Sequence, residues 1–217
     1  MRAVLWPDVL AFVRASLPEP PVRVLEIGAG DGALADVLRG CGFDVMAVDP
    51  HGDGDGVVAV GLVDVDAPSA SFDAAVSVVS LHHVVPLGGS MAHLANLVRP
   101  GGLLIVDEFD VSRIDDRAMT WWVGQQRAIG RDDFDDLDDP SKILADMQAH
   151  LHPVDTLLEA LVPYFHLGSP VWGPYLHRWH LPPGLRDVEV DLIGSGKLPA
   201  TGARMVGVRR DDGGAGG

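Results

Sequence analysis

Short runs of apolar residues alternate along this chain with segments in which apolar residues recur at every third or fourth position. The runs are rich in β-branched side chains and predict buried strands at residues 23–27, 44–48, 57–60 and 72–80. The helical spacing covers residues 5–16, 32–39 and 91–98. Gly88, Gly89 and Ser90 are the predicted cap of the last of these helices. Strands and helices that alternate in this order predict an α/β protein on a mostly parallel sheet.

The chain beyond residue 110 follows a different pattern. The segment from 111 to about 183 is longer than an ordinary connection between two strands, so it must contain helices of its own. Helices are predicted at residues 113–129, 141–150, 153–161 and 184–197, and a last strand at 204–209. Val188 and Val190 also permit a strand in the last of these helical segments. We expect a single domain over residues 1–210, a helical cap over about 111–183, a solvated acidic loop at 132–139 and a disordered tail at 211–217.

Three glycines at alternate positions follow the first predicted strand. They are Gly28, Gly30 and Gly32, in the sequence Glu-Ile-Gly-Ala-Gly-Asp-Gly. Glycine reaches positive φ angles and carries no Cβ, so such a turn brings bare backbone against a ligand at the carboxyl edge of a parallel sheet. The loop is therefore predicted to hold a cofactor.

Two classes of cofactor compete for this loop. The glycines together with Ala33 satisfy the dinucleotide-binding spacing, and Asp49 follows the second strand near the place of a ribose-binding acid. However, Glu26 and Asp31 would repel a pyrophosphate at this helix N-terminus. S-adenosylmethionine has no phosphate and carries a cationic sulfonium and an ammonium, so the same carboxylates would attract it.

At four places the sequence resembles the class I S-adenosylmethionine-dependent methyltransferases. Glu26-x-Gly28-x-Gly30-x-Gly32 is similar to their first motif, and residues 45–49 are similar to their second strand with its terminal acid. Residues 71–77 and 97–106 are similar to their fourth and fifth strands, so the four matches fall in the family's order. The resemblance, to the bacterial small-molecule branch, implies a Rossmann-like, doubly wound, mostly parallel seven-stranded sheet. It also implies an antiparallel edge strand and a helical cap inserted after strand five.

The resemblance also assigns cofactor-binding residues by position. Asp49 would accept hydrogen bonds from both ribose hydroxyls, a task that suits a carboxylate because one group must hold two donors. Asp64, or an acidic or polar residue within two positions of it, would face the adenine amino group, and a solvated turn at this place is the alternative. The full set of candidates is Glu26, Gly28, Ala29, Gly30, Gly32, Asp49, Pro50, Asp64, Val65 and Ser80.

His82 and His83 follow the fourth strand of the predicted sheet, at the edge that faces the transferable methyl group in the family fold. An imidazole there could hydrogen-bond the cofactor or remove a proton from the acceptor, so both are candidate catalytic residues. A pair of histidines after a strand also suits a helix start or side-chain packing. Asp107 and Glu108 reach the same edge and are candidate acceptor-binding acids.

The segment beyond residue 110 is rich in aromatic and imidazole side chains. These residues are Trp121, Trp122, Trp172, Trp179, Tyr164, Tyr175, His150, His152, His166, His177 and His180. They suit a pocket for a flat or apolar small molecule, and they suit equally the packing of a cap on the sheet. His150 and His152 form one closely spaced pair, and His177 and His180 form another. No cysteine accompanies these pairs and their spacing matches that of metal ligands poorly, so no metal is expected.

The composition of the chain excludes some classes of binding partner and favours one cellular compartment. The 217 residues carry a formal net charge of -15, which argues against a nucleic-acid backbone or an anionic membrane as the partner. The single cysteine, Cys41, excludes an internal disulfide and fits a reducing cytoplasm, and charged residues interrupt any export signal near the N-terminus. We expect a cytoplasmic monomer or homodimer that acts on a small-molecule acceptor.

The function predicted from the sequence is methyl transfer from S-adenosylmethionine to a small molecule. Two alternatives stay open. One is a methyltransferase-like protein that binds the cofactor without transferring methyl, because a fold does not fix a function. The other is an NAD(P)-dependent oxidoreductase, which Asp31 and the later motifs oppose.

Overall fold

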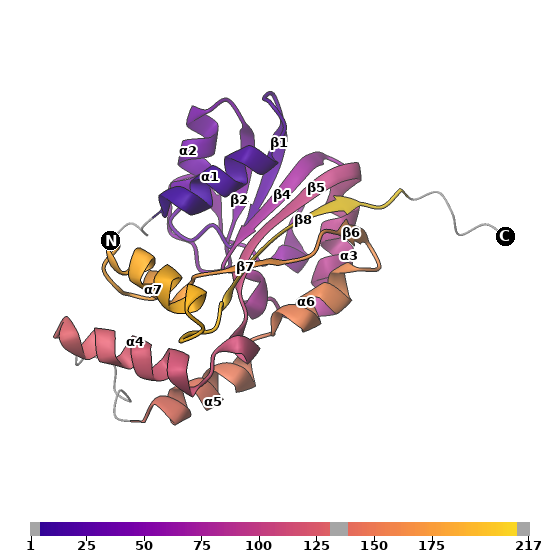
Figure 1. Ribbon diagram of the computed structural model, residues 1–217. Coiled ribbons are helices and arrows are strands. Elements are labelled where there is room, and N and C mark those ends of the chain that lie inside the picture. Colours follow the sequence, from indigo (N-terminus) through magenta and orange to yellow (C-terminus); the bar gives the residue numbers. More distant parts are fainter. Residues whose placement is uncertain (1–4, 131–138, 212–217) are drawn as a thin grey trace. The chain divides into compact units, whose positions relative to one another are not determined.

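One eight-stranded sheet organises the structure, a computed structural model that describes residues 5–130 and 139–211 (Figure 1). The strand order is β3-β2-β1-β4-β5-β8-β6, and β7 pairs with β8. The strands are β1 (Arg23–Ile27), β2 (Asp44–Val48), β3 (Val57–Val58), β4 (Phe72–Val78), β5 (Val98–Phe109), β6 (Phe165–Leu167), β7 (Val171–Gly173) and β8 (Gly202–Arg209). The predicted mostly parallel α/β sheet is confirmed, with one strand more than the seven expected.

The first five strands form the parallel part of the sheet. β1 pairs in parallel with both β2 and β4, and Leu25 lies opposite Met46 on one side and Ala75 on the other. β2 also pairs in parallel with β3, and β4 with β5. Four of the five positions of β1 are buried on both faces of the sheet, and three of them are apolar while the fourth is Glu26.

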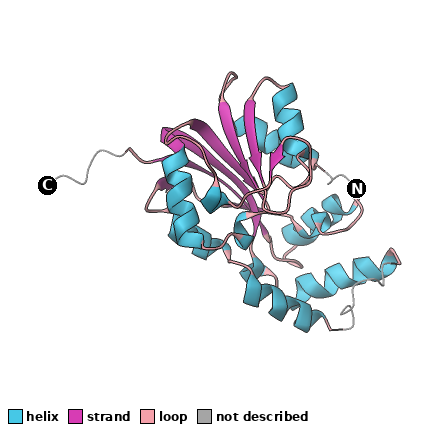
Figure 2. Ribbon diagram, turned by 180° about the vertical axis from the view of Figure 1, so that it is seen from behind, coloured by secondary structure: helices cyan, strands magenta, loops and turns pink. Residues whose placement is uncertain are grey.

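Helices cover both faces of the parallel strands. The connection from β1 through α2 (Ala33–Gly40) to β2 runs toward one edge of the sheet, and that from β4 through α3 (Leu87–Leu97) to β5 runs toward the other. Because such crossovers are right-handed, the two helices lie on opposite faces (Figures 1 and 2). α1 (Pro7–Ser16) shares the face of α2, where Val9 and Val13 pack in one buried cluster with Leu34 and Leu38.

Predicted boundaries of β3, α3 and β4 were wrong, and β3 ends at Val58 instead of residue 60. α3 begins at Leu87, so Gly88, Gly89 and Ser90 form its first turn instead of capping a later helix. The N–H of Ser90 donates to the carbonyl of Pro86, which closes that turn at 3.0 Å. β4 ends at Val78, two residues early, because Val79 has a φ angle of 52° and leaves the extended conformation.

The chain divides into two compact units. The first unit comprises residues 1–108, 156–169 and 205–217, and the second comprises residues 109–155 and 170–204. The remaining helices are α4 (Asp116–Ala128), α5 (Pro140–His150), α6 (Val154–Leu161) and α7 (Leu185–Gly194), which confirms the four helices predicted beyond residue 110. Residues 132–138 of the predicted acidic loop and 212–217 of the predicted tail lie outside the described residues. The assignment of one domain with a cap over 111–183 stays a prediction.

Two strands inside the predicted cap were missed. β6 and β7 have three residues each, and both pair antiparallel with β8. Three residues are too few to show a period, and their partner lies far along the chain. Among the helices of the described ranges, none has the length and apolar character needed to cross a membrane.

Candidate functional site

The order of the strands changes direction between β1 and β4. From this pair, the next strands in the chain lie on opposite sides, β2 beside β1 and β5 beside β4. In open α/β sheets a ligand binds in the crevice at the carboxyl ends of the strands at such a point. The glycine loop (residues 28–32) and residues 79–85 follow the ends of these two strands.

The glycine loop has the backbone conformation that the sequence predicts. Gly28, Gly30 and Gly32 have φ angles of 72°, 55° and 78°, in the left-handed region that side chains rarely adopt. The amides of Gly28 and Ala29 both donate to the carbonyl of Val48, at 2.8 and 3.0 Å. Gly28 also needs its lack of a side chain, because a Cβ there would overlap the side chain of Ser80.

Asp49 joins the end of β2 to the glycine loop. Its Oδ2 accepts a hydrogen bond from the amide of Gly30 at 3.0 Å, and its Oδ1 accepts one from the amide of His51 at 2.7 Å. A carboxylate has about four acceptor positions, so two such bonds leave capacity for further donors. These residues therefore fit a ligand that presents a pair of hydroxyls, as a ribose does.

A cavity of about 660 Å³ opens at these strand ends. Its volume lies within the range of roughly 300–1,000 Å³ that is usual for cofactor sites. The described lining residues all belong to the first unit and are Ile27, Gly28, Val48, Asp49, Pro50, His51, Val60, Gly61, Leu62, Val79, Ser80, His83, Val84 and Val85. The lining combines apolar walls with a few polar groups, which is the usual character of such a site.

Of the predicted site residues, Gly28, Asp49, Pro50, Ser80 and His83 line this cavity. The Oγ of Ser80 donates to the carbonyl of Ile27 at 2.7 Å, which ties the end of β4 to the glycine loop. Ala29, Gly30 and Gly32 lie in the loop but are not among the described lining residues.

The predicted adenine contacts lie slightly farther along the chain than the cavity wall. Asp64 and Val65 are not among the described lining residues, whereas Val60, Gly61 and Leu62 are. The carbonyl of Val65 is a partner of His93 Nε2 at 2.9 Å. The predicted contact of Asp64, or of an acidic or polar residue within two positions of it, with the adenine amino group stays a prediction. A short strand followed by a 3-10 turn (Leu62–Asp64) has no period that would fix the register more closely.

Glu26 lies on β1, two residues before Gly28, and is only 4% exposed. Burial raises the pKa of its carboxyl to about 8, and the nearby positive charge of Arg39 acts in the opposite direction. Burial therefore favours the neutral form of Glu26. A cation brought close to it would favour its ionised form.

His82 and His83, the two predicted catalytic candidates, occupy different environments. Both lie in a 3-10 turn, η2 (Leu81–His83), directly after β4. His83 is exposed and lines the cavity. His82 is only 3% exposed, and its Nδ1 lies 2.7 Å from Oε1 of Glu108. Asp107 and Glu108 are both buried.

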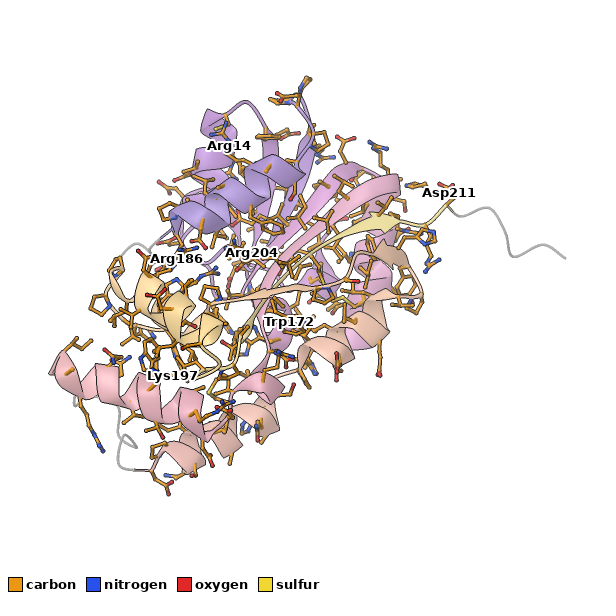
Figure 3. The ribbon with its side chains drawn as sticks, in the orientation of Figure 1. Arg14, Trp172, Arg186, Lys197, Arg204 and Asp211 are labelled. Atoms are coloured by element: carbon orange, nitrogen blue, oxygen red, sulfur yellow. The ribbon has the colours of Figure 1, made fainter. Side chains whose placement is uncertain are left out.

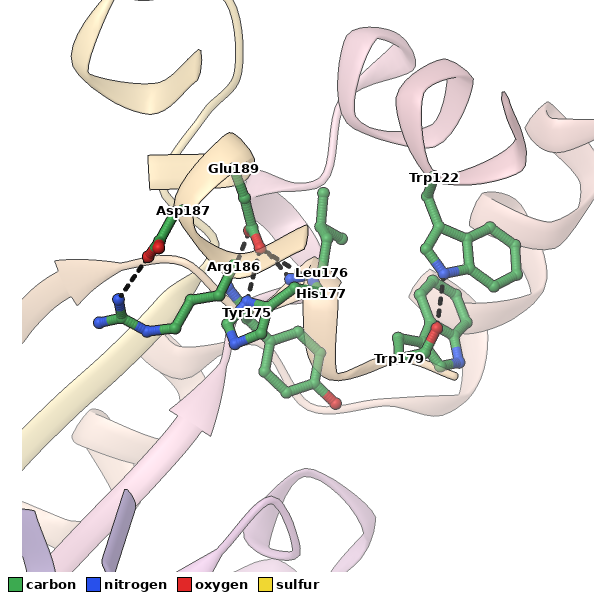
Figure 4. A network of polar contacts seen from close by, with 8 residues as sticks. All are labelled: Trp122, Tyr175, Leu176, His177, Trp179, Arg186, Asp187 and Glu189. Carbon is green, nitrogen blue, oxygen red and sulfur yellow. Dashed lines mark hydrogen bonds and ion pairs between the residues drawn. The ribbon is translucent and has the colours of Figure 1, made fainter. Parts of the chain in front are cut away.

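Two tryptophans of the second unit are in contact with each other (Figure 4). Trp122 stacks on Trp179 with 4.2 Å between ring centroids, and its Nε1 donates to the Trp179 carbonyl at 2.8 Å. Arg113 lies over the ring of Trp172, which Figure 3 labels, at 4.0 Å. Each of these contacts lies within the second unit.

Glu189 on α7 holds a buried turn of the second unit together. Its two carboxylate oxygens accept hydrogen bonds from the amides of Tyr175, Leu176 and His177 at 2.9–3.0 Å (Figure 4). The same carboxylate lies 2.7 Å from Nδ1 of His177. Across the described residues, no three His, Cys, Asp or Glu side chains are grouped so as to hold a metal ion.

Known proteins resemble this chain in sequence. The sequence model of the methyltransferase domain family matches residues 2–132. A ubiquinone biosynthesis O-methyltransferase of Methylocella silvestris is 33% identical over 104 residues, a match that covers 42% of this chain and only 41% of that protein. An uncharacterized methyltransferase of Mycobacterium bovis is 26% identical over 197 residues, covering 79% of this chain and 93% of that protein.

Solved structures resemble it in fold. The 1,6-didemethyltoxoflavin-N1-methyltransferase of Burkholderia thailandensis, solved with 1,6-didemethyltoxoflavin and S-adenosylhomocysteine bound, has a TM-score of 0.58 at 19% identity. That match covers 94% of this chain and 78% of the enzyme. An Anabaena variabilis putative methyltransferase from an antibiotic biosynthesis pathway has a TM-score of 0.60 at 14% identity, covering 93% and 96% of the two chains. Because the family's sequence model matches more than half of its length, this chain belongs to the methyltransferase domain family, whose class I members use S-adenosylmethionine.

Proposed function

We propose that this protein transfers a methyl group from S-adenosylmethionine to a small-molecule acceptor. The observation that carries the proposal is the cavity at the switch point of the sheet, where the glycine loop and the Asp49 carboxylate meet an exposed imidazole, His83. S-adenosylmethionine supplies a sulfonium, which is already a reactive methyl donor. The task left to the protein is to bind, to orient and to exclude water, and orientation alone is worth about 7–11 kcal/mol.

The cofactor would be held by the residues around the glycine loop. Asp49 would accept hydrogen bonds from the ribose hydroxyls, since its carboxylate is fixed by the amides of Gly30 and His51. Gly28 lets the backbone approach a ligand closely. Glu26 would take its charged form next to the ammonium group, which offsets the cost of its burial. Val60, Gly61 and Leu62 would form the wall of the adenine site.

His83 would act at the acceptor. If the acceptor is a hydroxyl or an acidic carbon, the His83 imidazole would take the proton that leaves as the new bond to methyl forms. If the acceptor is an amine, positioning suffices. Val79, Val84 and Val85 give this part of the cavity an apolar wall.

A small-molecule acceptor agrees with the charge of the chain and with its relatives. A formal net charge of -15 is unfavourable for a nucleic-acid substrate. Two relatives are named for small molecules, ubiquinone and 1,6-didemethyltoxoflavin. We also propose that the enzyme works in the cytoplasm as a monomer or homodimer. In this proposal residues 1–210 act as one catalytic domain, with a cap formed by about 111–183.

The direct test is formation of S-adenosylhomocysteine from S-adenosylmethionine, measured across a panel of phenols, amines and acidic carbon compounds. Turnover with one class of acceptor would support the proposal and identify the atom methylated. A folded protein that binds S-adenosylmethionine and never forms S-adenosylhomocysteine would instead favour a non-transferring, cofactor-binding role.

A further inference from the structure

Glu108 is a buried acid outside the cavity at the strand ends. It lies near the end of β5, is 1% exposed, and is not among the described residues that line the cavity. Both of its oxygens are bound to one residue. Oε1 lies 2.7 Å from Nδ1 of His82, and Oε2 accepts a hydrogen bond from the main-chain amide of His82 at 3.3 Å.

This pair of contacts places a proton on Nδ1 of His82. A carboxylate in its ionised form only accepts hydrogen bonds, so the short contact requires the imidazole to donate from Nδ1. Because the same carboxylate also accepts from the backbone amide, it holds the side chain and the main chain of His82 together. A glutamine at this position could accept only through its single oxygen, and its amide N–H groups would face the second donor.

His82 belongs to the turn that carries His83 to the cavity. The amide of His83 donates to the carbonyl of Ser80, and that of Val84 donates to the carbonyl of Leu81, both at 3.1 Å. The rings of His82 and His83 are in contact, with 4.1 Å between their centroids. Glu108 therefore binds the turn through His82, and the turn contributes His83 to the lining of the cavity.

We propose that Glu108 is a positioning residue, which fixes the η2 turn through His82 and so sets the place of His83 at the cavity wall. The inference rests on the proposed function only in its last step, the effect on methyl transfer. Glu108 does not bind the acceptor in this arrangement, because its carboxylate is buried and committed to His82.

The first test needs no substitution and no substrate. Long-range ¹H–¹⁵N spectra of the imidazoles of the intact protein should show a proton on Nδ1 of His82. An Nδ1 that carries no proton would overturn the proposal, whatever the protein's reaction is.

The second test compares Glu108→Gln with Glu189→Gln, its matched control. Both changes replace a buried glutamate that pairs with a histidine at 2.7 Å, but Glu189 pairs with His177 in the second unit. Glu108→Gln should shift the imidazole signals of His83, and Glu189→Gln should shift those of His177 and leave His83 unchanged. His83 signals that do not respond to Glu108→Gln would contradict the proposal.

The third test uses the reaction and a double-mutant cycle. Glu108→Gln should lower kcat by about 100-fold, the loss that follows when a reacting group is displaced by about 1 Å, and leave the Kd for S-adenosylmethionine unchanged. In a His82→Ala background the same change should have no further effect on kcat, because the imidazole through which Glu108 acts on His83 has been removed. An equal loss in both backgrounds would show that Glu108 does not act through His82. If no acceptor is ever methylated, the proposed function fails while the two spectroscopic tests still decide the role of Glu108.

Discussion

Gly28 lies so close to Ser80 that a Cβ at position 28 would overlap the serine side chain. The contact joins the glycine loop after β1 to the residues that follow β4, and the hydrogen bond from Ser80 to the Ile27 carbonyl reinforces it. Two strands that are neighbours in the sheet therefore share one edge of the cavity. The site therefore requires glycine at position 28, because any larger residue would overlap the side chain of Ser80.

Replacing Gly28 by alanine should destabilise the protein by more than about 2 kcal/mol, because the left-handed backbone and the overlap both add a cost. Gly30→Ala is the matched control, since its φ angle is also positive but nothing lies within 4 Å of the added Cβ. It should cost about 1–2 kcal/mol. Urea unfolding measures both values, and equal losses would show that the contact with Ser80 is unimportant.

The stability of the protein should depend on the charge of Glu26. Its folded pKa of about 8 lies above its ordinary value of 4.5, so the folded state binds the proton more tightly than the unfolded state does. The resulting stabilisation is fully present below pH 4.5 and is lost as the pH rises toward 8. Relative to Glu26→Gln, the wild type should lose up to about 1.4 kcal/mol of unfolding free energy per pH unit in this window. If the unfolding free energies of the two proteins differ by a constant amount from pH 5 to pH 8, the raised pKa of Glu26 is contradicted.

His83→Ala should slow methyl transfer to a hydroxyl or acidic carbon by about 100-fold, the usual contribution of a general base. Binding of S-adenosylmethionine should be retained, because Asp49 and the glycine loop are untouched. The control is His166→Ala, which removes an exposed imidazole of the first unit on β6. Rates that fall equally in both variants would remove His83 from the reaction.

Glu189→Ala should destabilise the second unit by about 3–5 kcal/mol, because three buried amides and the His177 imidazole lose their acceptor. Hydrogen exchange of those amides, together with the melting temperature, measures the effect. Glu159→Ala, at an exposed position of α6, is the control and should change little. An unchanged melting temperature for Glu189→Ala would show that the turn is held by other contacts.

The parallel part of the fold was predictable because each strand there carries its own signal. β1 and β2 have the predicted bounds, since their apolar runs end at a glycine loop and at an acid. β6 and β7 were missed because their pairing with β8 depends on residues far along the chain. The start of α3 was misjudged because glycines usually end helices, whereas Gly88 and Gly89 here lie within its first turn.

The candidate site was predictable to a similar extent. The spacing of the glycines and the place of Asp49 follow from local rules, and the structure gives the glycines the expected positive φ angles. The adjacent residues His82 and His83 looked equivalent in the sequence. They differ because Glu108, which lies 26 positions from His82, contacts the His82 imidazole, whereas His83 lines the cavity. Such a relation between two strand ends has no signal in either segment alone.

The most direct test of the central claim is calorimetric titration of S-adenosylmethionine, S-adenosylhomocysteine and NADH into the wild type, Asp49→Ala and Asp53→Ala. The last variant is the control, because it removes the same charge from an exposed position of the adjacent loop. We expect the first two ligands to bind and NADH not to bind. Asp49→Ala should weaken binding by about 100-fold, the equivalent of losing two charge-assisted hydrogen bonds, and Asp53→Ala should leave it unchanged. Binding of NADH alone, or equal effects of the two substitutions, would contradict a cofactor site organised by Asp49.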